Sequence, residues 1–193
     1  MARPRLHDAS LRARLLEEAS RSISTGGGGA VTVRAVAAAA GTSASAVYAL
    51  FGSRDDLVTA VSTEGFRRFA AHLDAVARTD DALGDLRALA LAYRDSALDD
   101  PHFYRVMFER SITPEGDAQA AVERPTFKVL RSAVARVLAG APADEIDAVA
   151  IGLWGLVHGL VSLELADLLP GDDDARAARY AQAVTAIGPA LLS

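Results

Sequence analysis

The sequence has no cysteine among its 193 residues. That absence excludes a disulfide framework, a thiolate nucleophile and a cysteine-ligated zinc site. Long hydrophobic runs are also lacking, because the longest uncharged apolar stretch, Ala148–Leu163, is interrupted by His158 and is shorter than the about 20 residues that span a bilayer. We expect this stretch to be a buried core or interface helix. Since residues 1–20 carry no continuous apolar segment of the signal-peptide kind, we expect a soluble, cytoplasmic protein with no membrane partner.

Motifs that mark common enzyme sites are missing as well. The chain has no GxSxG, GxxxxGK, GxGxxG or HExxH motif. Its four histidines, at positions 7, 72, 102 and 158, are scattered, so they do not stand at the spacing of metal ligands. We therefore expect a protein that is not an enzyme and that needs no metal or other cofactor. A small helical enzyme, whose groups are brought together only by folding, remains a rival interpretation.

Strand signals are nearly absent, because the only β-branched run, Val31–Val33, is too short to pair. Apolar residues recur at helical spacing along most of the chain, which predicts an all-α fold of about nine helices. The first helix is expected to run from near Asp8 to a point before the glycine run Gly26–Gly29, and a long helix from Asp55 to about Ala77. Other predicted helix starts are Thr32, Ser43, Ser53 with Asp56, Thr79-Asp80, Asp100-Pro101, Pro125, Ala143 and Asp172–Asp174.

Charge is distributed unevenly along the chain. The formal net charge is −5. Residues 1–54 hold seven arginines against three acidic residues and carry +4, so the remaining residues carry −9. A basic N-terminal part on an acidic body indicates that only this part meets a polyanion. Chance clustering of surface charge is the alternative.

Residues 32–51 predict two helices of about two turns each, joined at Gly41-Thr42-Ser43. A helix-turn-helix needs a bracing first helix, a glycine at the turn, and a second helix whose exposed N-terminal half enters the major groove. Three apolar residues of the second helix, Val47, Leu50 and Phe51, are expected to face inward and anchor it. The segment therefore predicts an N-terminal three-helix DNA-binding domain.

The DNA-contacting residues follow from that arrangement. The predicted set is Thr32, Arg34, Ser43, Ala44, Ser45, Ala46, Tyr48, Ala49 and Arg54. Alanines on the second helix are suited to thymine methyl groups, and serines to bases or phosphates. The threonine, tyrosine and two arginines are suited to phosphate oxygens, which position a protein without reading sequence. In the alternative interpretation, Tyr48 covers the edge of the small domain, and Arg34 and Arg54 are solvated surface charges.

The gapless segment Thr32–Leu57, about 26 residues, resembles the DNA-binding segment of TetR-family transcriptional regulators. The family pattern has Thr, an apolar residue and Arg, then Ala-Gly and Ser, and it ends in Tyr-x-x-Phe-x-x-Lys/Arg-x-x-Leu. One departure is Ala44, which stands where the family usually has lysine, and Ser45 stands where glycine is common. The loss of that lysine shifts the expected phosphate binding toward Arg34, Tyr48, Arg54 and the basic N-terminal arm.

A second segment, Leu153–Glu164, is similar to the Trp-x-x-x-His-Gly segment in the effector domain of one TetR subgroup, and residues 100–108 resemble its mid-domain helix. This resemblance implies an all-helical effector-binding half that forms a homodimer through its last two helices, as a four-helix bundle. The predicted ligand-binding residues are Tyr93, Phe103, Met107, Phe108, Phe127, Trp154 and His158. Ordinary core packing, or for Trp154 and His158 the dimer seam, is the alternative.

Together these features predict a transcriptional repressor with residues 1–54 as the helix-turn-helix domain and residues 55–193 as the ligand-binding and dimerisation domain. Its partners would be double-stranded operator DNA, a second copy of the chain, and a small apolar or amphipathic effector. The effector would act by changing the separation of the two recognition helices, with the long helix from Asp55 as the lever and the irregular residues 111–124 as the pocket gate. The alternative is a helical DNA-binding or protein-interaction module without an effector.

Overall fold

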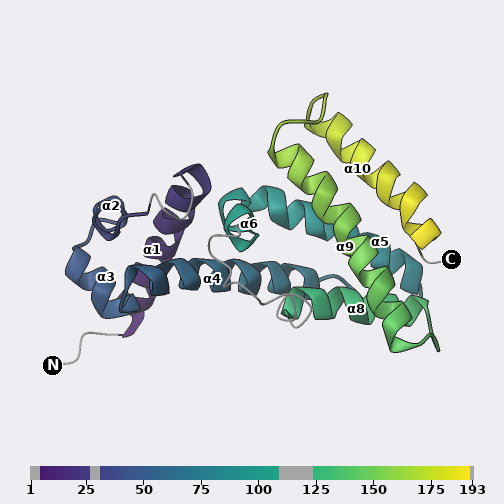
Figure 1. Cartoon of the computed structure of the whole chain (residues 1–193), viewed down its shortest axis with the longest axis horizontal. Helices are drawn as coiled ribbons and strands as arrows, with labels where there is room; N and C mark the ends of the chain where they lie inside the picture. The colour runs from purple at the N-terminus through teal and green to yellow at the C-terminus, as the bar shows by residue number, and fades with distance from the viewer. Residues whose placement is uncertain (1–4, 27–30, 109–123, 192–193) are drawn as a thin grey trace. The chain divides into compact units, whose positions relative to one another are not determined.

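The computed structural model describes residues 5–26, 31–108 and 124–191. Those residues contain nine α-helices and one short 3-10 helix, and no strand, which confirms the all-α prediction (Figure 1). The helices are α1 (Arg5–Gly26), α2 (Val33–Ala39), α3 (Ala44–Phe51), α4 (Arg54–Asp74), α5 (Ala82–Asp99), α6 (Pro101–Met107), α8 (Pro125–Val137), α9 (Ala143–Leu165), α10 (Asp173–Ile187) and η2 (Gly188–Leu191). Arg3 of the basic arm and residues 111–123 of the predicted gate lie outside the described residues.

Three helices have boundaries that differ from the predicted ones. Helix α1 begins at Arg5 instead of Asp8, and it includes Gly26, which the sequence pattern places beyond its end. Helix α4 ends at Asp74, short of Ala77. Helix α5 begins at Ala82 instead of Thr79, because the backbone amide and the hydroxyl of Thr79 donate to the Asp85 carboxylate and hold Thr79 outside the helix.

The chain divides into two compact units. The described parts of Met1–Arg67 and Asp100–Asp117 form the first unit, and those of Arg68–Asp99 and Ala118–Ser193 form the second. The chain thus leaves the first unit within α4 and returns to it for α6. The functional boundary after residue 54 is a different division of the chain and stays a prediction.

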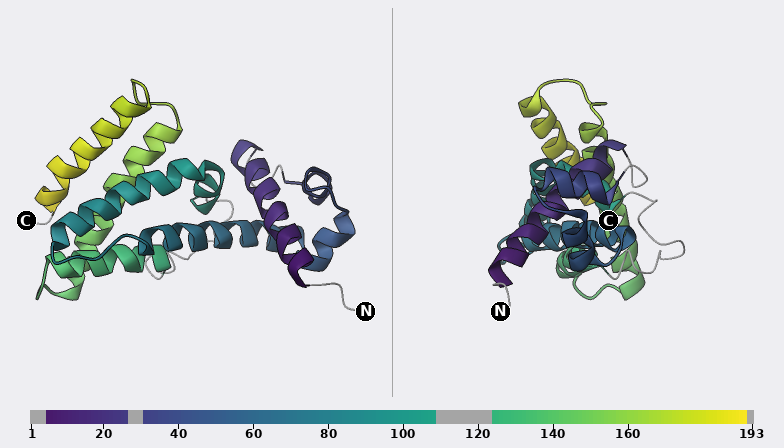
Figure 2. Two further views of the ribbon diagram at one scale, coloured as in Figure 1. Left: turned by 180° about the vertical axis from the view of Figure 1, so that it is seen from behind. Right: turned by 90° about the vertical axis from the view of Figure 1, so that its left-hand side faces the viewer.

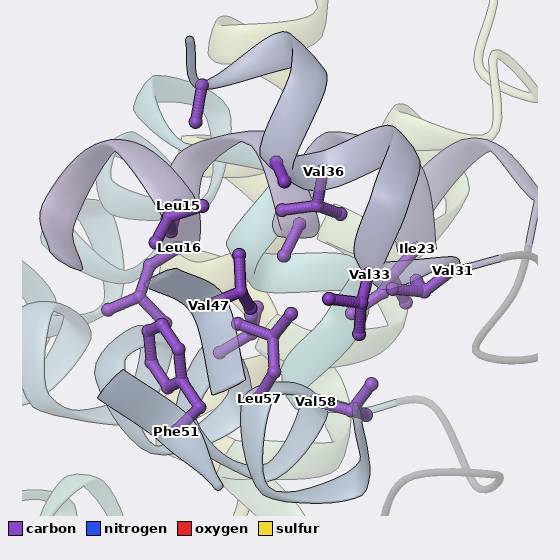
Figure 3. Packing of buried hydrophobic residues seen from close by; sticks show 14 of the residues in the cluster. Leu15, Leu16, Ile23, Val31, Val33, Val36, Val47, Phe51, Leu57 and Val58 are labelled. Carbon is purple, nitrogen blue, oxygen red and sulfur yellow. The ribbon is translucent and has the colours of Figure 1, made fainter. Parts of the chain in front are cut away.

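The core of the first unit is built from one apolar face of each of its helices (Figure 3). Helix α1 has its most extensive contacts with α6. It also contacts α2, which in turn contacts α3. The buried cluster is Leu15, Leu16, Ala19, Ile23, Val31, Val33, Val36, Ala37, Ala40, Val47, Phe51, Leu57, Val58, Val61, Phe103 and Val106. Val47 and Phe51 are buried there and Leu50 packs against the cluster, which confirms the three inward-facing residues of α3. The same packing fixes which side of α3 faces outward.

The second unit consists of the end of α4 with α5, α8, α9, α10 and η2. Its core joins α5, α8 and α9 through Leu86, Phe127, Val134, Ile146, Ala150 and Leu153. Helices α9 and α10 run side by side (Figures 1 and 2). Among the described helices α9 alone is long and apolar enough to cross a membrane, a test that the bent pair α2 and α3 passes only when taken together. Ile146, Ala150 and Leu153 of α9 lie in the core of the second unit. The apolar residues on that face of α9 are therefore explained by burial inside the protein.

Candidate DNA-binding interface

Helices α2 and α3 form a helix-turn-helix. They are bent by 107° at the short break between them, within the range of about 90–120° that this motif shows. The turn contains Gly41 with φ +68°, a left-handed conformation that glycine adopts without the strain of a Cβ atom. Two backbone hydrogen bonds close the turn: the Gly41 amide donates to the Ala38 carbonyl, and the Thr42 amide donates to the Ala37 carbonyl. The predicted bracing helix, glycine and second helix are therefore all present.

Each helix of this motif begins at a side-chain cap. Thr32 Oγ1 accepts a hydrogen bond from the Ala35 amide, and Ser43 Oγ accepts one from the Ala46 amide, both at 3.2 Å. The two caps satisfy amide groups that a helix start leaves without partners. Each hydroxyl keeps a proton that it can donate to an acceptor outside the protein, such as a phosphate oxygen. The predicted cap residues are confirmed, and Thr32 and Ser43 are both exposed.

The outward side of α3 carries small residues and one tyrosine. Ser43, Ser45, Tyr48 and Ala49 are exposed, and 52% of the Tyr48 surface is accessible although the helix is anchored by its opposite face. Ala46 is half-buried, and half-buried Ala44 packs against the core cluster. These four exposed residues thus form the accessible part of this surface.

Two arginines of the predicted set have different surroundings. Arg34 is exposed on α2. Arg54 is half-buried at the start of α4, where its Nε donates to the Val31 carbonyl and its Nη1 to Asp55 Oδ1, each at 2.9 Å. The assignment of both arginines as DNA contacts stays a prediction, but Arg54 has acceptors within its own chain.

The predicted ligand-binding residues fall into both compact units. Phe103 and Met107 of α6 are buried in the first unit, where Phe103 belongs to the core shared with α2 and α3. Phe108 packs edge-on to Phe66 in that unit, with ring centroids 5.8 Å apart. The second unit holds the other four predicted residues.

Those four residues form a connected line of rings in the second unit. Tyr93 Oη lies 3.3 Å from His158 Nδ1, and the His158 ring centroid lies 6.3 Å from that of Trp154. Trp154 meets Phe127 edge-on at 6.0 Å. Burial lowers the pKa of His158, so the imidazole is neutral at neutral pH. The line offers apolar surface and hydrogen-bonding groups without a net charge.

A pocket in the second unit lies elsewhere. It is lined by Leu73, Val76, Ala77, Arg78, Asp85, Leu89, Val129, Ser132, Ala133 and Arg136, and by none of the seven predicted ligand residues. Arg136 Nη1 donates to Asp85 Oδ2 at 2.7 Å within this pocket. Sequence reasoning does not identify this pair, because the two residues are 51 positions apart and neither belongs to a motif.

A helix-turn-helix with an exposed recognition helix, attached to a second helical unit, defines a DNA-binding regulator. Residues 15–61 match the family model described as bacterial regulatory proteins, tetR family, and residues 86–187 match the one described as tetracyclin repressor-like, C-terminal domain. The chain belongs to the TetR family of transcriptional regulators, with a DNA-binding and a ligand-binding domain. Members are transcription factors and not enzymes, which confirms the non-enzyme prediction.

Solved structures agree with this family. A bacterial regulatory protein in the tetR family from Rhodococcus RHA1 is 27% identical, with a TM-score of 0.71 over 95% of this chain and 97% of that chain. A TetR family transcription regulator from Marinobacter aquaeolei is 21% identical (TM-score 0.74; 93% and 96% covered), and PfmR, a TetR family transcriptional regulator from Thermus thermophilus, is 20% identical (TM-score 0.69; 93% and 97% covered). No curated protein matches the chain at a significant level.

Proposed function

We propose that this chain is a homodimeric repressor that binds operator DNA through α3 and is released by a small apolar or amphipathic effector. The observation that carries the proposal is the exposure of Tyr48 and its small neighbours on a helix whose other face is fixed in the core. Two copies of α3, set one DNA turn or about 34–36 Å apart, would enter successive major grooves. Because operators lie on the chromosome, the proposed place of action is the cytoplasm.

The DNA contacts proposed for one protomer are the predicted residues from Thr32 to Ala49, with Ser45 and Ala49 nearest to the bases and Tyr48 as a phosphate contact. Small side chains support close approach of α3 to the groove floor, where a methyl or hydroxyl group meets a base edge. Thr32, Ser43 and Arg34 are exposed at the ends of the motif, the position from which side chains reach phosphates. We propose that these contacts compensate for Ala44, which stands where the family usually has lysine.

The proposed dimer interface lies on the last two helices. Ile151, Gly155, Gly159 and Leu163 follow one another at four-residue intervals on α9, and both large residues of this stripe are exposed. A Cβ atom added at either glycine would meet no described atom within 4 Å. On α10 the large apolar side chain of Ile187 is exposed as well. The stripe is apolar, and its two glycines have no side chain that would hold a neighbouring helix away. These features support close packing of α9 and α10 against the same two helices of a second copy.

The proposed effector site includes the ring line of the second unit, consistent with the Trp-His-Gly subgroup that Trp154, His158 and Gly159 resemble. Neutral His158 and the aromatic rings favour an uncharged apolar or amphipathic molecule. Phe103, Met107 and Phe108 of α6, which lie in the first unit, stay predicted ligand-binding residues. Since the effector shifts the dimer only by its differential affinity for two states, it must bind the DNA-free arrangement more tightly. Helix α4, which continues from the first unit into the second, is the proposed lever.

The DNA-binding face is tested with Arg34→Ala and Tyr48→Ala, measured against a duplex that the wild-type protein protects in footprints beside its own gene. Arg34→Ala should weaken binding and lower the slope of log K against log salt by about one, whereas Tyr48→Ala, which removes an uncharged contact, should weaken binding and leave the slope unchanged. Arg78→Ala is the matched control, because it removes an exposed arginine from the second unit. If Arg34→Ala and Tyr48→Ala both bind the duplex like the wild type, the proposed face is wrong.

The effector is tested through Trp154, the only tryptophan of the chain. Apolar compounds that release the protein from the duplex should also change the Trp154 emission, and His158→Ala should weaken both effects. Release without any change in emission would place the effector away from Trp154, whereas no release by any compound that binds would favour the module without an effector.

A further inference from the structure

Arg54 joins the two ends of the helix-turn-helix. Its Nε donates to the carbonyl of Val31, a residue 23 positions earlier that directly precedes Thr32, the cap of α2. Arg54 itself opens α4, two residues beyond Gly52, which ends α3. The hydrogen bond therefore connects the segment that enters α2 with the helix that follows α3, and the recognition helix lies between these two points in the chain.

Both anchor points of this bond are held in place by the core. Val31 is 1% exposed, and Leu57 on the first turn of α4 is fully buried. A carbonyl at such a buried position needs a donor, and Arg54 Nε supplies one. By contrast, the partner of Nη1 is Asp55, whose side chain is 89% exposed, so this ion pair contributes little. Of these two contacts of Arg54, the hydrogen bond from Nε is the one that connects distant parts of the chain.

We infer that Arg54 is a positioning residue of the DNA-binding surface: through its Nε–H it fixes the start of α2, and with it Thr32 and Arg34, against the start of α4. This inference rests on the proposed function of that surface. It differs from the expectation that Arg54 is a phosphate contact, because the positioning role depends on the Nε donor and not on the positive charge. Without the bond, part of the binding free energy would be consumed in ordering the entry to α2.

Two substitutions separate the donor from the charge. Arg54→Gln places a side-chain N–H at the same position along the side chain as Nε but removes the charge. Arg54→Lys keeps the charge but has a methylene group at that position and its ammonium group one atom further out. A positioning residue should tolerate Arg54→Gln and be impaired by Arg54→Lys, whereas a phosphate contact should show the reverse order.

The experiment measures affinity for the footprinted duplex and for a random-sequence duplex as a function of salt. We expect Arg54→Gln to bind the footprinted duplex within about twofold of wild type, and Arg54→Lys to lose roughly tenfold, the free energy of about one hydrogen bond to a charged group. The salt slope should stay unchanged in both variants, and Arg54→Lys should lose affinity for both duplexes, because Thr32 and Arg34, which Arg54 positions, are assigned to phosphate contacts. A urea midpoint like that of the wild type excludes a loss of folding.

The opposite order, with Arg54→Lys like wild type and a salt slope lowered by about one in Arg54→Gln, overturns the inference in favour of a phosphate contact. Equal effects of the two substitutions, or none, overturn it as well. Either result leaves the proposed function intact as long as Arg34→Ala and Tyr48→Ala weaken binding. If those two variants bind like wild type, the proposed function fails whatever Arg54 does.

Discussion

Arg94 on α5 and Glu164 on α9 form an ion pair with two parallel hydrogen bonds, Nε to Oε2 at 2.8 Å and Nη2 to Oε1 at 2.5 Å. Their side chains are only 11% and 6% exposed. Removing one partner of a buried pair leaves the other charge without compensation. We therefore expect Glu164→Gln to lower the free energy of unfolding by about 3 kcal/mol, as measured by urea denaturation.

The control for this prediction is the pair of Arg21 and Glu18 on α1, whose side chains are 57% and 27% exposed. An ion pair in contact with water contributes about 1 kcal/mol or less, so Glu18→Gln should change the urea midpoint only slightly. Equal losses for Glu18→Gln and Glu164→Gln would show that burial does not set the contribution of these pairs.

Replacement of Gly41 should destabilise the protein because of the backbone conformation at this position and not because of a steric clash. A Cβ atom at this position would meet nothing within 4 Å among the described residues, but φ is +68°. A left-handed conformation costs an alanine about 1–2 kcal/mol and an asparagine less. Gly41→Ala should therefore lower the thermal midpoint more than Gly41→Asn does. The reverse order of the two variants would argue against a left-handed turn.

Asp85 should make the free energy of unfolding depend on pH in the acidic range. The Thr79 amide, the Arg136 guanidinium and the Thr79 hydroxyl all donate to its carboxylate, and together they lower the pKa of Asp85 below its ordinary value of 3.8. Because the folded pKa lies below the unfolded one, the stabilisation is complete above about pH 4 and disappears as pH falls through the folded pKa. Asp85→Asn should be less stable than wild type at pH 7, and this difference should shrink toward pH 3. A constant difference over that range would contradict the assignment.

The proposed dimer interface predicts that Ile151→Arg produces monomers. Ile151 is 49% exposed on α9, so the substitution should leave the fold of one chain intact while it buries a charge between two chains. We expect dimerisation to weaken by at least about 2 kcal/mol, as measured by sedimentation equilibrium. Leu91→Arg on α5, where leucine is 43% exposed, is the matched control and should stay dimeric. If Leu91→Arg is monomeric, or if Ile151→Arg stays dimeric, the dimer interface lies elsewhere on the protein.

Local signals explain why the helix-turn-helix could be predicted from the sequence. Thr32 and Ser43 cap helices that start at the next residue, and Ser53 and Asp56 bond to each other as the capping-box spacing predicts. These interactions join residues three positions apart. The inward set of α3 follows from the same short-range periodicity.

Contacts between distant residues could not be predicted in this way. Ser24 Oγ lies 2.6 Å from His102 Nδ1 although the two residues are 78 positions apart, and this contact belongs to the packing of α6 against α1. Periodicity shows which face of α6 is apolar, but not which partner covers it. For that reason the sequence predicts Phe103 as a pocket residue but not its place in the core of the first unit. The Val31 carbonyl, which accepts the hydrogen bond from Arg54 Nε, could not be predicted for the same reason.

The return of the chain into the first unit limits how its DNA-binding part can be transplanted. A fragment that stops at Arg67 would lack Phe103 and Val106, and the apolar surface that they cover on the first unit would face water. A chimera that gives this recognition surface to another sensor must therefore carry two separate pieces of the gene, one for residues 1–67 and one for α6. An exchange made at a single junction would yield a protein prone to aggregation.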